Sequence, residues 1–515
     1  MKSLSSPKTF VLLLLFIFIS TCGLRLAYAC GPFTRYAIFS FTKHPDMPFD
    51  KFSGGEPGVI KPSYARSYLY VAYRLMTGAR FTQAEQQALT ELWNARLNYG
   101  QGDEDETGGA WQLARKKVSG VTDDVQTEYY RAADKGDYTS FLNCTPDAYR
   151  NAAKTLEERI QKFGASSDEA KAWVQGQDLV FTNCAREGTM PTAAPDSAPQ
   201  QVKYDRAYQI AAAHFYSMNY DEARTHFERI ASDASSPWHE QAQYLVARAL
   251  IRKASIGDEA SRPEALAQAE AQLKKVLAET HQSALKLSAQ NLLNLIKLRM
   301  NPAQLMRELT QSLLRPGPNS NLKQELWDYT ILLDRYLGDS DEPADENLKK
   351  ALDAGEKDEL TDWLITFQAE PKDSLEHAAE RWQRTNSLPW LVAALSKVEA
   401  NDAKAAALMA AAERVEPASP AYATAQYHLI RLSLEKGERA VARRRLDSIL
   451  QQAGLSISTA NLFRHQRMLL ATDLEDFLKY AERPPAAYSW DDDGREVPID
   501  IKEDEDLKSW GGRTL

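Results

Sequence analysis

Cysteine, histidine and long apolar runs are all scarce in this chain of 515 residues. It has four cysteines and eight histidines, and no two histidines have the i, i+4 spacing of a helical zinc site. It contains no glycine-rich phosphate-binding loop and no Gly-x-Ser-x-Gly elbow. The longest uninterrupted apolar run, residues 10–19, is too short to span a bilayer. The sequence therefore predicts no enzyme, no catalytic residue, no metal and no cofactor.

Basic residues are fewer than acidic ones, with 62 Lys and Arg against 71 Asp and Glu. The net charge is −9, and the first 29 residues contain Lys2, Lys8 and Arg25 without an acid, so a chain that began at Cys30 would carry −12. Nucleic-acid binding needs a basic face that neutralises phosphates, and none is evident here. We therefore expect no nucleic-acid partner.

The first 29 residues have the three parts of an export signal in the usual order. Lys2 and Lys8 give a positive start, residues 10–19 an apolar core, and Ala27-Tyr28-Ala29 a small-x-small cleavage site. A buried first helix is the alternative. We predict a signal peptide at 1–29 and an exported protein, in the periplasm or at the cell surface of a bacterium.

Cleavage after Ala29 would make Cys30 the first mature residue. Bacterial lipoproteins begin with such a cysteine, so Cys30 is a possible lipid attachment site that would tether the chain to a membrane. Lipoproteins usually have Leu three residues before that cysteine, where this chain has Ala27. Ordinary cleavage with a free Cys30 is the alternative, so a membrane contact is expected only if Cys30 is lipidated.

Residues 30–185 are expected to form an N-terminal domain that starts with an extended, aromatic-rich arm. Residues 30–64 interleave aromatic residues with Pro and Gly at a density that excludes a helix, and one short strand is possible at 36–42. The arm would pack along a helical body, and an aromatic ligand surface is the alternative. Helices are expected at 64–77 and 82–97, followed by an acidic, solvated loop at 100–109.

Two cysteines, Cys144 and Cys184, lie at the far ends of a predicted helical hairpin. Thr145-Pro146 begins the first helix, Gly164 ends it, and Ser166-x-x-Glu169 is a capping box for the second. Gly164 is twenty residues from each cysteine, so equal antiparallel arms bring the two together. In an exported protein this predicts a disulfide, which would stabilise the fold by roughly 4 kcal/mol.

A linker rich in Pro, Ala and Ser at 186–203 separates this domain from a region with internal repeats. Residues 236–253, SPWHEQAQYLVARALIRK, return as residues 419–436, SPAYATAQYHLIRLSLEK. Similar residues precede and follow both copies. Such self-similarity is typical of helical hairpins that stack and share one core.

The repeat region resembles tetratricopeptide repeats (TPR). The hairpin at 204–232 places Ala211, Tyr220, Ala223 and Phe227 where that repeat has its small and bulky packing residues, although His214 replaces an aromatic residue. The resemblance extends over 236–279 and about 389–451. It implies an all-α fold, a TPR-like solenoid, with block 1 at 204–337, an acidic linker at 338–346 and block 2 at 347–482.

The last residues, 483–515, are rich in Asp and Glu, and we predict that they form a disordered tail. Within it, residues 489–500 match some positions of a calcium-binding EF-hand loop. Pro498 and the prolines upstream argue against the flanking helices that such a site requires.

The mature chain as a whole is similar to a group of uncharacterised secreted bacterial proteins with TPR-like helices. The matching residues are Cys30-Gly31-Pro32-Phe33, Phe141-Leu142-Asn143-Cys144 and Ser236-Pro237-Trp238. This resemblance implies a fold and an exported location, but no activity.

The repeated motif supplies the candidate binding residues. Tyr244 and Arg248 share a helix face, and so do Tyr427 and Arg431. They could line a groove in which arginine holds a carboxylate, or the guanidinium could stack on tyrosine inside the solenoid. The sequence favours the second alternative, because the motif repeats with the structural elements.

These observations favour a non-catalytic scaffold for protein–protein interaction in the bacterial cell envelope. Its partner would be a protein or peptide, which the sequence does not identify. The alternative is a surface lipoprotein that captures glycans or peptides for uptake.

Overall fold

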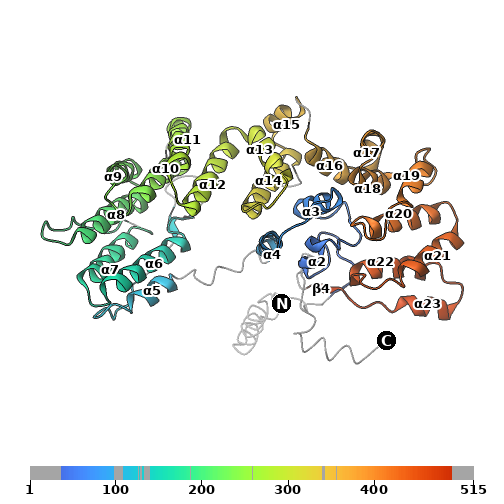
Figure 1. Cartoon of the computed structure of the whole chain (residues 1–515), viewed down its shortest axis with the longest axis horizontal. Coiled ribbons are helices and arrows are strands. Elements are labelled where there is room, and N and C mark those ends of the chain that lie inside the picture. Colours follow the sequence, from blue (N-terminus) through green and yellow to red (C-terminus); the bar gives the residue numbers. More distant parts are fainter. Residues whose placement is uncertain are drawn as a thin grey trace, which may run out of the picture. The chain divides into compact units, whose positions relative to one another are not determined.

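The computed structural model describes residues 36–97, 108–125, 127, 130–132, 140–185, 187–257, 259–338, 343–354 and 357–489. The fold is mostly helical, as the sequence predicts, with 22 α-helices and little strand among these residues (Figure 1). In the described part, no helix is both long and apolar enough to cross a membrane. The predicted signal peptide, Cys30, the centre of the acidic loop and almost all of the tail lie outside the described residues.

The chain folds as two compact units, and the division falls inside α4 (Gln83–Leu97). Unit 1 combines residues up to Thr90 with those from Glu359 onward, and unit 2 is the stretch between them. The sequence had placed the boundaries at its linkers instead. The predicted boundaries differ from the observed division because the N-terminal segment, residues 36–65, packs against helices that follow more than 300 residues later. No local sequence pattern can reveal such a contact.

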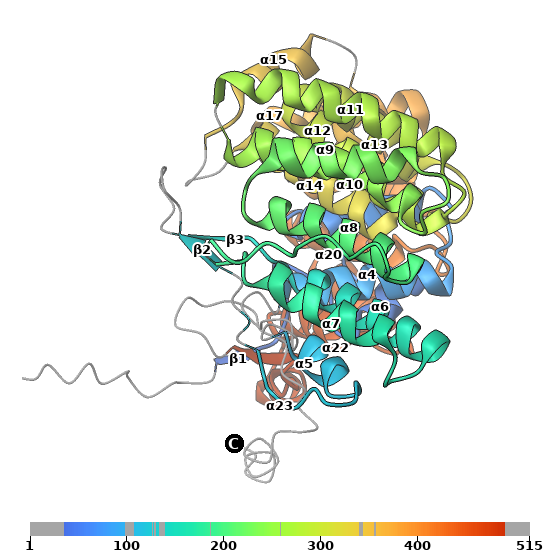
Figure 2. The same ribbon diagram turned by 90° about the vertical axis from the view of Figure 1, so that its left-hand side faces the viewer.

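Among its described residues, unit 2 contains eleven α-helices besides the end of α4, and a two-stranded ribbon. From α6 to α11 each helix packs against the next, and Figure 2 shows them side by side in a stack. The ribbon, which the sequence did not predict, pairs β2 (Tyr130–Ala132) with β3 (Ser140–Leu142). The helices, besides the end of α4, are α5 (Gly109–Arg115), α6 (Pro146–Phe163), α7 (Asp168–Phe181), α8 (Gln200–Tyr216), α9 (Tyr220–Ser232), α10 (His239–Ile256), α11 (Arg262–Glu279), α12 (Ser283–Met300), α13 (Pro302–Leu314), α14 (Leu322–Leu337) and α15 (Glu346–Asp353).

The predicted disulfide is confirmed. Cys144 and Cys184 are bonded, with 5.5 Å between their Cα atoms, and Gly164 ends α6 at a φ of 96°. The predicted cap of α7 was wrong by one residue. Ser167, not Ser166, is the N-cap, and its hydroxyl accepts a hydrogen bond from the amide of Ala170.

Unit 1 joins the N-terminal segment to the helices of the second repeat region. Its short strands β1 (Tyr36–Ile38) and β4 (Ala487–Ser489) pair antiparallel, so the expected tail begins with ordered structure. Its helices, besides the start of α4, are α2 (Phe49–Gly54), α3 (Arg66–Met76), α16 (Glu359–Gln368), α17 (Pro371–Thr385), α18 (Leu388–Lys397), α19 (Ala405–Ala412), α20 (Tyr422–Glu435), α21 (Arg439–Ile449), α22 (Ile457–Met468) and α23 (Leu474–Ala481).

The short helix α2 corrects the expectation that Pro and Gly exclude helix from the N-terminal segment. Pro48 occupies its N-cap position and Gly55 its C-cap, where φ is 114°. Proline is tolerated just before a helix, and glycine readily adopts the left-handed conformation that ends one. The two residues therefore set the limits of a helix of six residues and do not prevent it.

Candidate functional site

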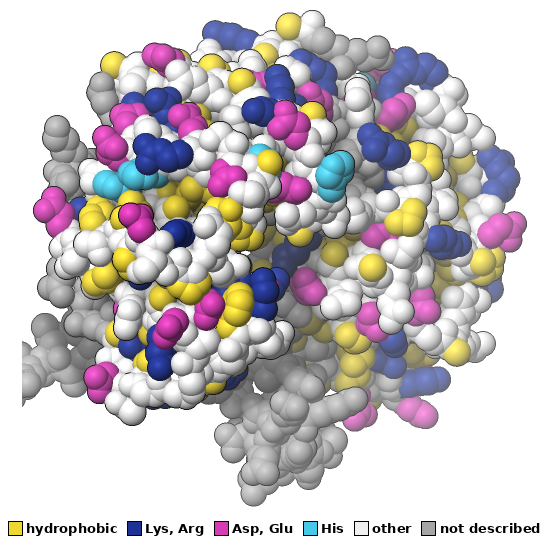
Figure 3. Space-filling view, turned by 60° about the vertical axis from the view of Figure 1, so that its left-hand side comes forward, with side chains coloured by type: hydrophobic (Ala, Val, Ile, Leu, Met, Phe, Trp, Pro, Cys, Tyr) yellow, Lys and Arg dark blue, Asp and Glu magenta, His cyan; other side chains and the backbone are white. Residues whose placement is uncertain are grey.

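Unit 2 contains a cavity of about 320 Å³ among helices α6, α7, α8 and α10. On the face of unit 2 that comes forward in Figure 3, hydrophobic side chains gather in one area and charged side chains surround it. The cavity lining combines rings with a few polar groups. Its rings are Trp173, Tyr208, Phe215, Tyr216, Phe227 and Trp238, and its polar groups include Asp147, Asn151, Glu158, Gln177, Gln241 and Arg248.

Three stacked rings form one wall of this cavity. The centroids of Tyr208 and Trp238 are 4.0 Å apart at 15° between planes, and Trp173 lies 5.8 Å from Trp238 at 9°. The indole nitrogen of Trp238 donates to Asp205 at 2.9 Å. Asp205 is 3% exposed and also accepts two bonds from Arg159, at 2.8 and 2.9 Å. This buried ion pair and its bond to the indole hold the ring of Trp238 in place.

Arg248 brings a positive charge into this aromatic cavity. Its guanidinium lies 5.8 Å from the centroid of the Phe215 ring, a cation–π contact. Burial alone would lower the pKa of Arg248, but Tyr244, Tyr216 and Asp147 outweigh it, so the pKa is raised and the side chain stays charged. Among the described residues, no hydrogen bond or ion pair reaches its guanidinium.

Two side chains already bond the carbonyl at the end of α8, which faces the same region as Arg248. The main-chain carbonyl of Tyr216, at the end of α8, accepts from the Asn143 side chain at 2.8 Å and from Arg131 at 3.4 Å. Asn143 also donates to the carbonyl of Cys184 at 2.7 Å. The carbonyl of Tyr216, a lining residue, is therefore already satisfied by other donors, and Arg248 makes no bond to it.

Arg431, which occupies the same repeat position in unit 1, is fully engaged. Its guanidinium donates to the carbonyls of Leu395 and Val398, at 2.9 and 2.8 Å, and to Glu435 at 2.6 Å. These carbonyls lie at the C-terminal end of α18, where a cation is favourable. Arg431 therefore stabilises helix packing, whereas Arg248 lines a cavity.

Two further polar side chains of the unit 2 cavity have no partner in the described part of the chain. Gln177 is 5% exposed, and its Oε1 atom is buried without a hydrogen bond. Gln241, on α10, also makes no hydrogen bond. A buried amide oxygen without a partner is unfavourable by roughly 1–3 kcal/mol, so a ligand that bonded Gln177 would recover that energy.

The two tyrosines of the motif lie beside the cores and are only partly buried. The sequence favours a place for both tyrosines inside the solenoid, and the structure leaves each of them partly exposed. Tyr244 packs on the core of unit 2, where burial raises its pKa, and Tyr427 contacts His428 and Phe463. Neither tyrosine belongs to the lining of the unit 2 cavity.

A second cavity, of about 490 Å³, lies in unit 1 between the N-terminal segment and the loops before α20 and α22. The Ser419-Pro420 step of the repeat lines it, as Pro237 lines the cavity of unit 2. Of its two acids, Asp46 already accepts from the Ser456 hydroxyl and the Ser458 amide, at 2.6 and 2.9 Å, and Glu56 is exposed to solvent. This cavity is therefore the weaker candidate.

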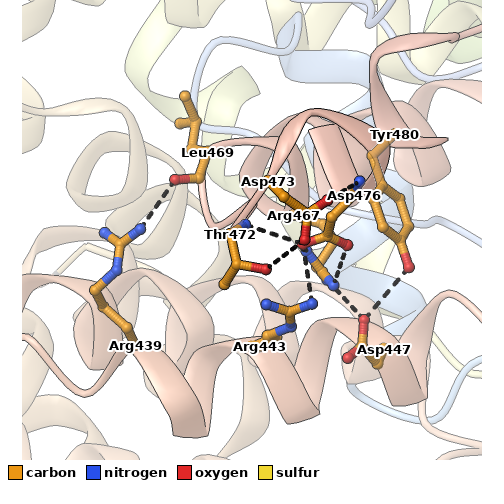
Figure 4. Close-up of polar contacts among 9 residues, drawn as sticks. All are labelled: Arg439, Arg443, Asp447, Arg467, Leu469, Thr472, Asp473, Asp476 and Tyr480. Atoms are coloured by element: carbon orange, nitrogen blue, oxygen red, sulfur yellow. Dashed lines mark hydrogen bonds and ion pairs between the residues drawn. The ribbon is translucent and has the colours of Figure 1, made fainter. Parts of the chain in front are cut away.

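A dense polar cluster joins α21, α22 and α23 (Figure 4). Arg467, with 3% of its side chain exposed, donates to Asp476 at 2.8 and 3.0 Å and to Asp447 at 2.7 Å. Arg443 adds an ion pair to Asp476 at 2.9 Å, and the bonds from Arg467 lower the pKa of Asp476. The guanidinium of Arg467 also lies 4.5 Å from the Tyr480 ring centroid. The groups satisfy one another, which is typical of a structural network.

The sequence identified Arg248 and the packing residue Phe227, but not the other rings of the cavity. The signal available was Trp238, which follows the first Ser-Pro step of the repeat, where the second copy has Ala421. No group of three or more potential metal-binding His, Cys, Asp or Glu side chains occurs among the described residues. Searches with this chain found no matching family model, no matching curated protein and no matching solved structure.

Proposed function

We propose that this protein is a non-catalytic scaffold for protein–protein interaction, exported to the bacterial cell envelope and built on TPR-like repeats. The packing of consecutive helices supports the repeat assignment. Ala211 and Ala223, the expected small residues of the first hairpin, are fully buried, and Phe227 is 1% exposed. Small residues at such positions let paired helices approach closely.

The observation that carries the proposed function is the unpaired guanidinium of Arg248 in an aromatic cavity. The charged guanidinium of Arg248 makes no hydrogen bond within the described part of the chain, and a carboxylate brought by a ligand would pair with it through charged hydrogen bonds. The rings around it offer apolar surface to an adjacent side chain. We therefore propose that the cavity binds a polypeptide segment that carries an acidic side chain or a carboxyl terminus.

Affinity selection from a pool of random decapeptides tests this function. The full chain is incubated with the pool, retained peptides are sequenced, and each is then titrated by fluorescence anisotropy. Arg248→Gln should weaken binding by about 10- to 100-fold, because hydrogen bonds to charged groups contribute roughly 1.5–3 kcal/mol. Replacing the peptide's carboxylate by an amide should weaken binding to the wild type equally and to the variant little.

Two matched variants serve as controls. Arg229 is exposed on α9 outside the cavity, so Arg229→Gln should bind like the wild type. Arg431→Gln should lower the melting temperature, because it removes the bonds to the end of α18, yet leave peptide binding unchanged. Equal binding by Arg248→Gln and the wild type would contradict the proposal. Retention of oligosaccharides instead of peptides would favour the alternative of a glycan-capturing lipoprotein.

A further inference from the structure

Unit 1 shows how a repeat helix of this chain holds a polypeptide segment. The hydroxyl of Thr424 on α20 accepts from the amide of Ile60 at 2.9 Å and donates to the carbonyl of Gly58 at 3.3 Å. The amide between them, that of Val59, donates to Thr459 on α22 at 3.3 Å. Gly58 turns the chain here, with a φ of 63°, so the main-chain groups of this non-helical stretch bond side chains of two different helices.

The same kind of contact recurs along the N-terminal segment. Asn461 donates to the carbonyl of Phe39 at 2.9 Å, and Ser458 accepts from the amide of Phe41 at 3.1 Å. Gln368 on α16 donates to the carbonyls of Pro62 and Tyr64. Side chains of the repeat helices therefore hold main-chain atoms of the segment, which is a form of binding that depends little on the segment's sequence.

Apolar and acidic side chains of the segment add to these contacts. Val59 is 3% exposed and packs in a core cluster with Ile430, Leu446 and Phe463. Asp46 bonds at the start of α22, as described above. The segment thus has three elements of attachment, namely a held main chain, an apolar anchor and a carboxylate.

The alignment of the two repeat copies identifies the residue of unit 2 that corresponds to Thr424. Aligning Ser236 with Ser419 places Gln241 at the position of Thr424. Gln241 lines the cavity, and its amide has no hydrogen bond in the described part of the chain. An amide side chain has both a donor and an acceptor, as the Thr424 hydroxyl has. The unit 2 cavity also has counterparts for the other two elements. Its rings can contact an apolar side chain, and Arg248 can pair with a carboxylate.

We infer that the cavity of unit 2 binds its partner as a non-helical segment, whose main chain is held by Gln241 as unit 1 holds its own N-terminal segment. Gln177, with its unpartnered buried oxygen, is placed to accept a further donor of the segment. The ligand class is therefore a non-helical polypeptide segment with one apolar residue and a nearby carboxylate. This inference rests on the proposed function and adds the conformation of the ligand and the role of Gln241.

An N-methyl scan of a selected decapeptide tests the inference with the full chain. Each peptide amide is methylated in turn, and binding to the wild type, Gln241→Leu and Gln241→Thr is measured by anisotropy. We expect one amide whose methylation weakens wild-type binding about 3- to 10-fold, the range of one neutral hydrogen bond. In Gln241→Leu that sensitivity should vanish, and in Gln241→Thr, which copies unit 1, it should return. Transferred nuclear Overhauser effects from the bound peptide should lack the sequential amide–amide pattern of a helix.

The outcomes separate this inference from the proposed function. If no peptide depends on Arg248, the proposed function fails first. If peptides bind through Arg248 but adopt a helix, or if the methylation pattern is the same in Gln241→Leu, the proposed function survives and the main-chain binding mode is overturned. Gln241→Leu is a conservative change at a partly buried position, and its melting temperature checks that the fold is intact.

Discussion

Acid should destabilise unit 1 through His428. This histidine is 6% exposed on α20, and its Nδ1 atom lies 3.4 Å from the Nε atom of Arg431. Burial first, and the charge of Arg431 second, lower its pKa to about 3. The imidazole is therefore neutral in the folded state at any pH well above that value.

The sign and size of the effect follow from linkage. An unfolded histidine has a pKa of about 6.5, so below that pH the unfolded state binds a proton that folded His428 does not. The free energy of unfolding then falls by about 1.4 kcal/mol per pH unit until the folded pKa is reached. Between pH 7.5 and pH 4.5 this one residue should lower stability by about 3 kcal/mol.

The substitution His428→Leu isolates this contribution, because Leu245 already occupies the same repeat position in α10. The two proteins are unfolded in urea at several pH values, followed by circular dichroism, and hydrogen exchange of α20 peptides localises the change. The wild type should lose about 3 kcal/mol more than the variant over this range. Replacement of His465, an exposed histidine of unit 1, is the matched control.

A flat difference between wild type and His428→Leu would refute the reasoning. Acid also protonates carboxylates such as Asp476, whose lowered pKa makes its contribution fall at low pH, but both proteins share that loss. Only a term that depends on His428 remains in the difference. If it varied by less than about 0.5 kcal/mol, the imidazole would be protonated in the folded state or open to solvent.

Three other substitutions test the packing. Gly58→Ala should destabilise unit 1 by about 2 kcal/mol, measured by urea unfolding, because φ is 63° and the new Cβ would lie 2.3 Å from Thr459 Oγ1. Asp205→Ala should lower the stability of unit 2 by about 3–5 kcal/mol, because Arg159 would stay buried without its partner, and an unchanged melting temperature would contradict this. Cys144→Ser should lower the free energy of unfolding by about 4 kcal/mol in the chain-entropy model. Free thiols at Cys144 and Cys184, found by peptide mapping of the wild type, would contradict the disulfide.

Local patterns in the sequence predicted the helices well, because helix starts, ends and apolar spacing are local properties. The disulfide followed from the same information, since Gly164 is equidistant from both cysteines. The pairing of Phe41 with Ser458 could not be predicted in this way, because nothing in either segment's own pattern specifies a partner 417 residues away. The sequence therefore predicted an N-terminal arm but not the helices against which it packs.

The candidate site was predicted in part for a related reason. The repeat singled out Arg248 and Arg431 together, as equivalent residues. Their environments differ because Asn143 and Arg131 satisfy the end of α8, whereas the end of α18 depends on Arg431. That difference arises from neighbours that are distant in sequence, so the motif could identify the residues but not their separate roles.

The discontinuity of unit 1 sets an order for its assembly as the chain is made. Residues 36–65 are synthesised before unit 2, but the side chains that hold them, from Gln368 to Asn461, come after it. Unit 2 can thus close its disulfide and pack while the N-terminal segment still has no binding partner. Completing unit 1 requires a loop that contains all of unit 2, and long-range closure of this kind is slow. During that interval Phe41, Val59 and their neighbours are exposed, which makes them the expected contact of a chaperone.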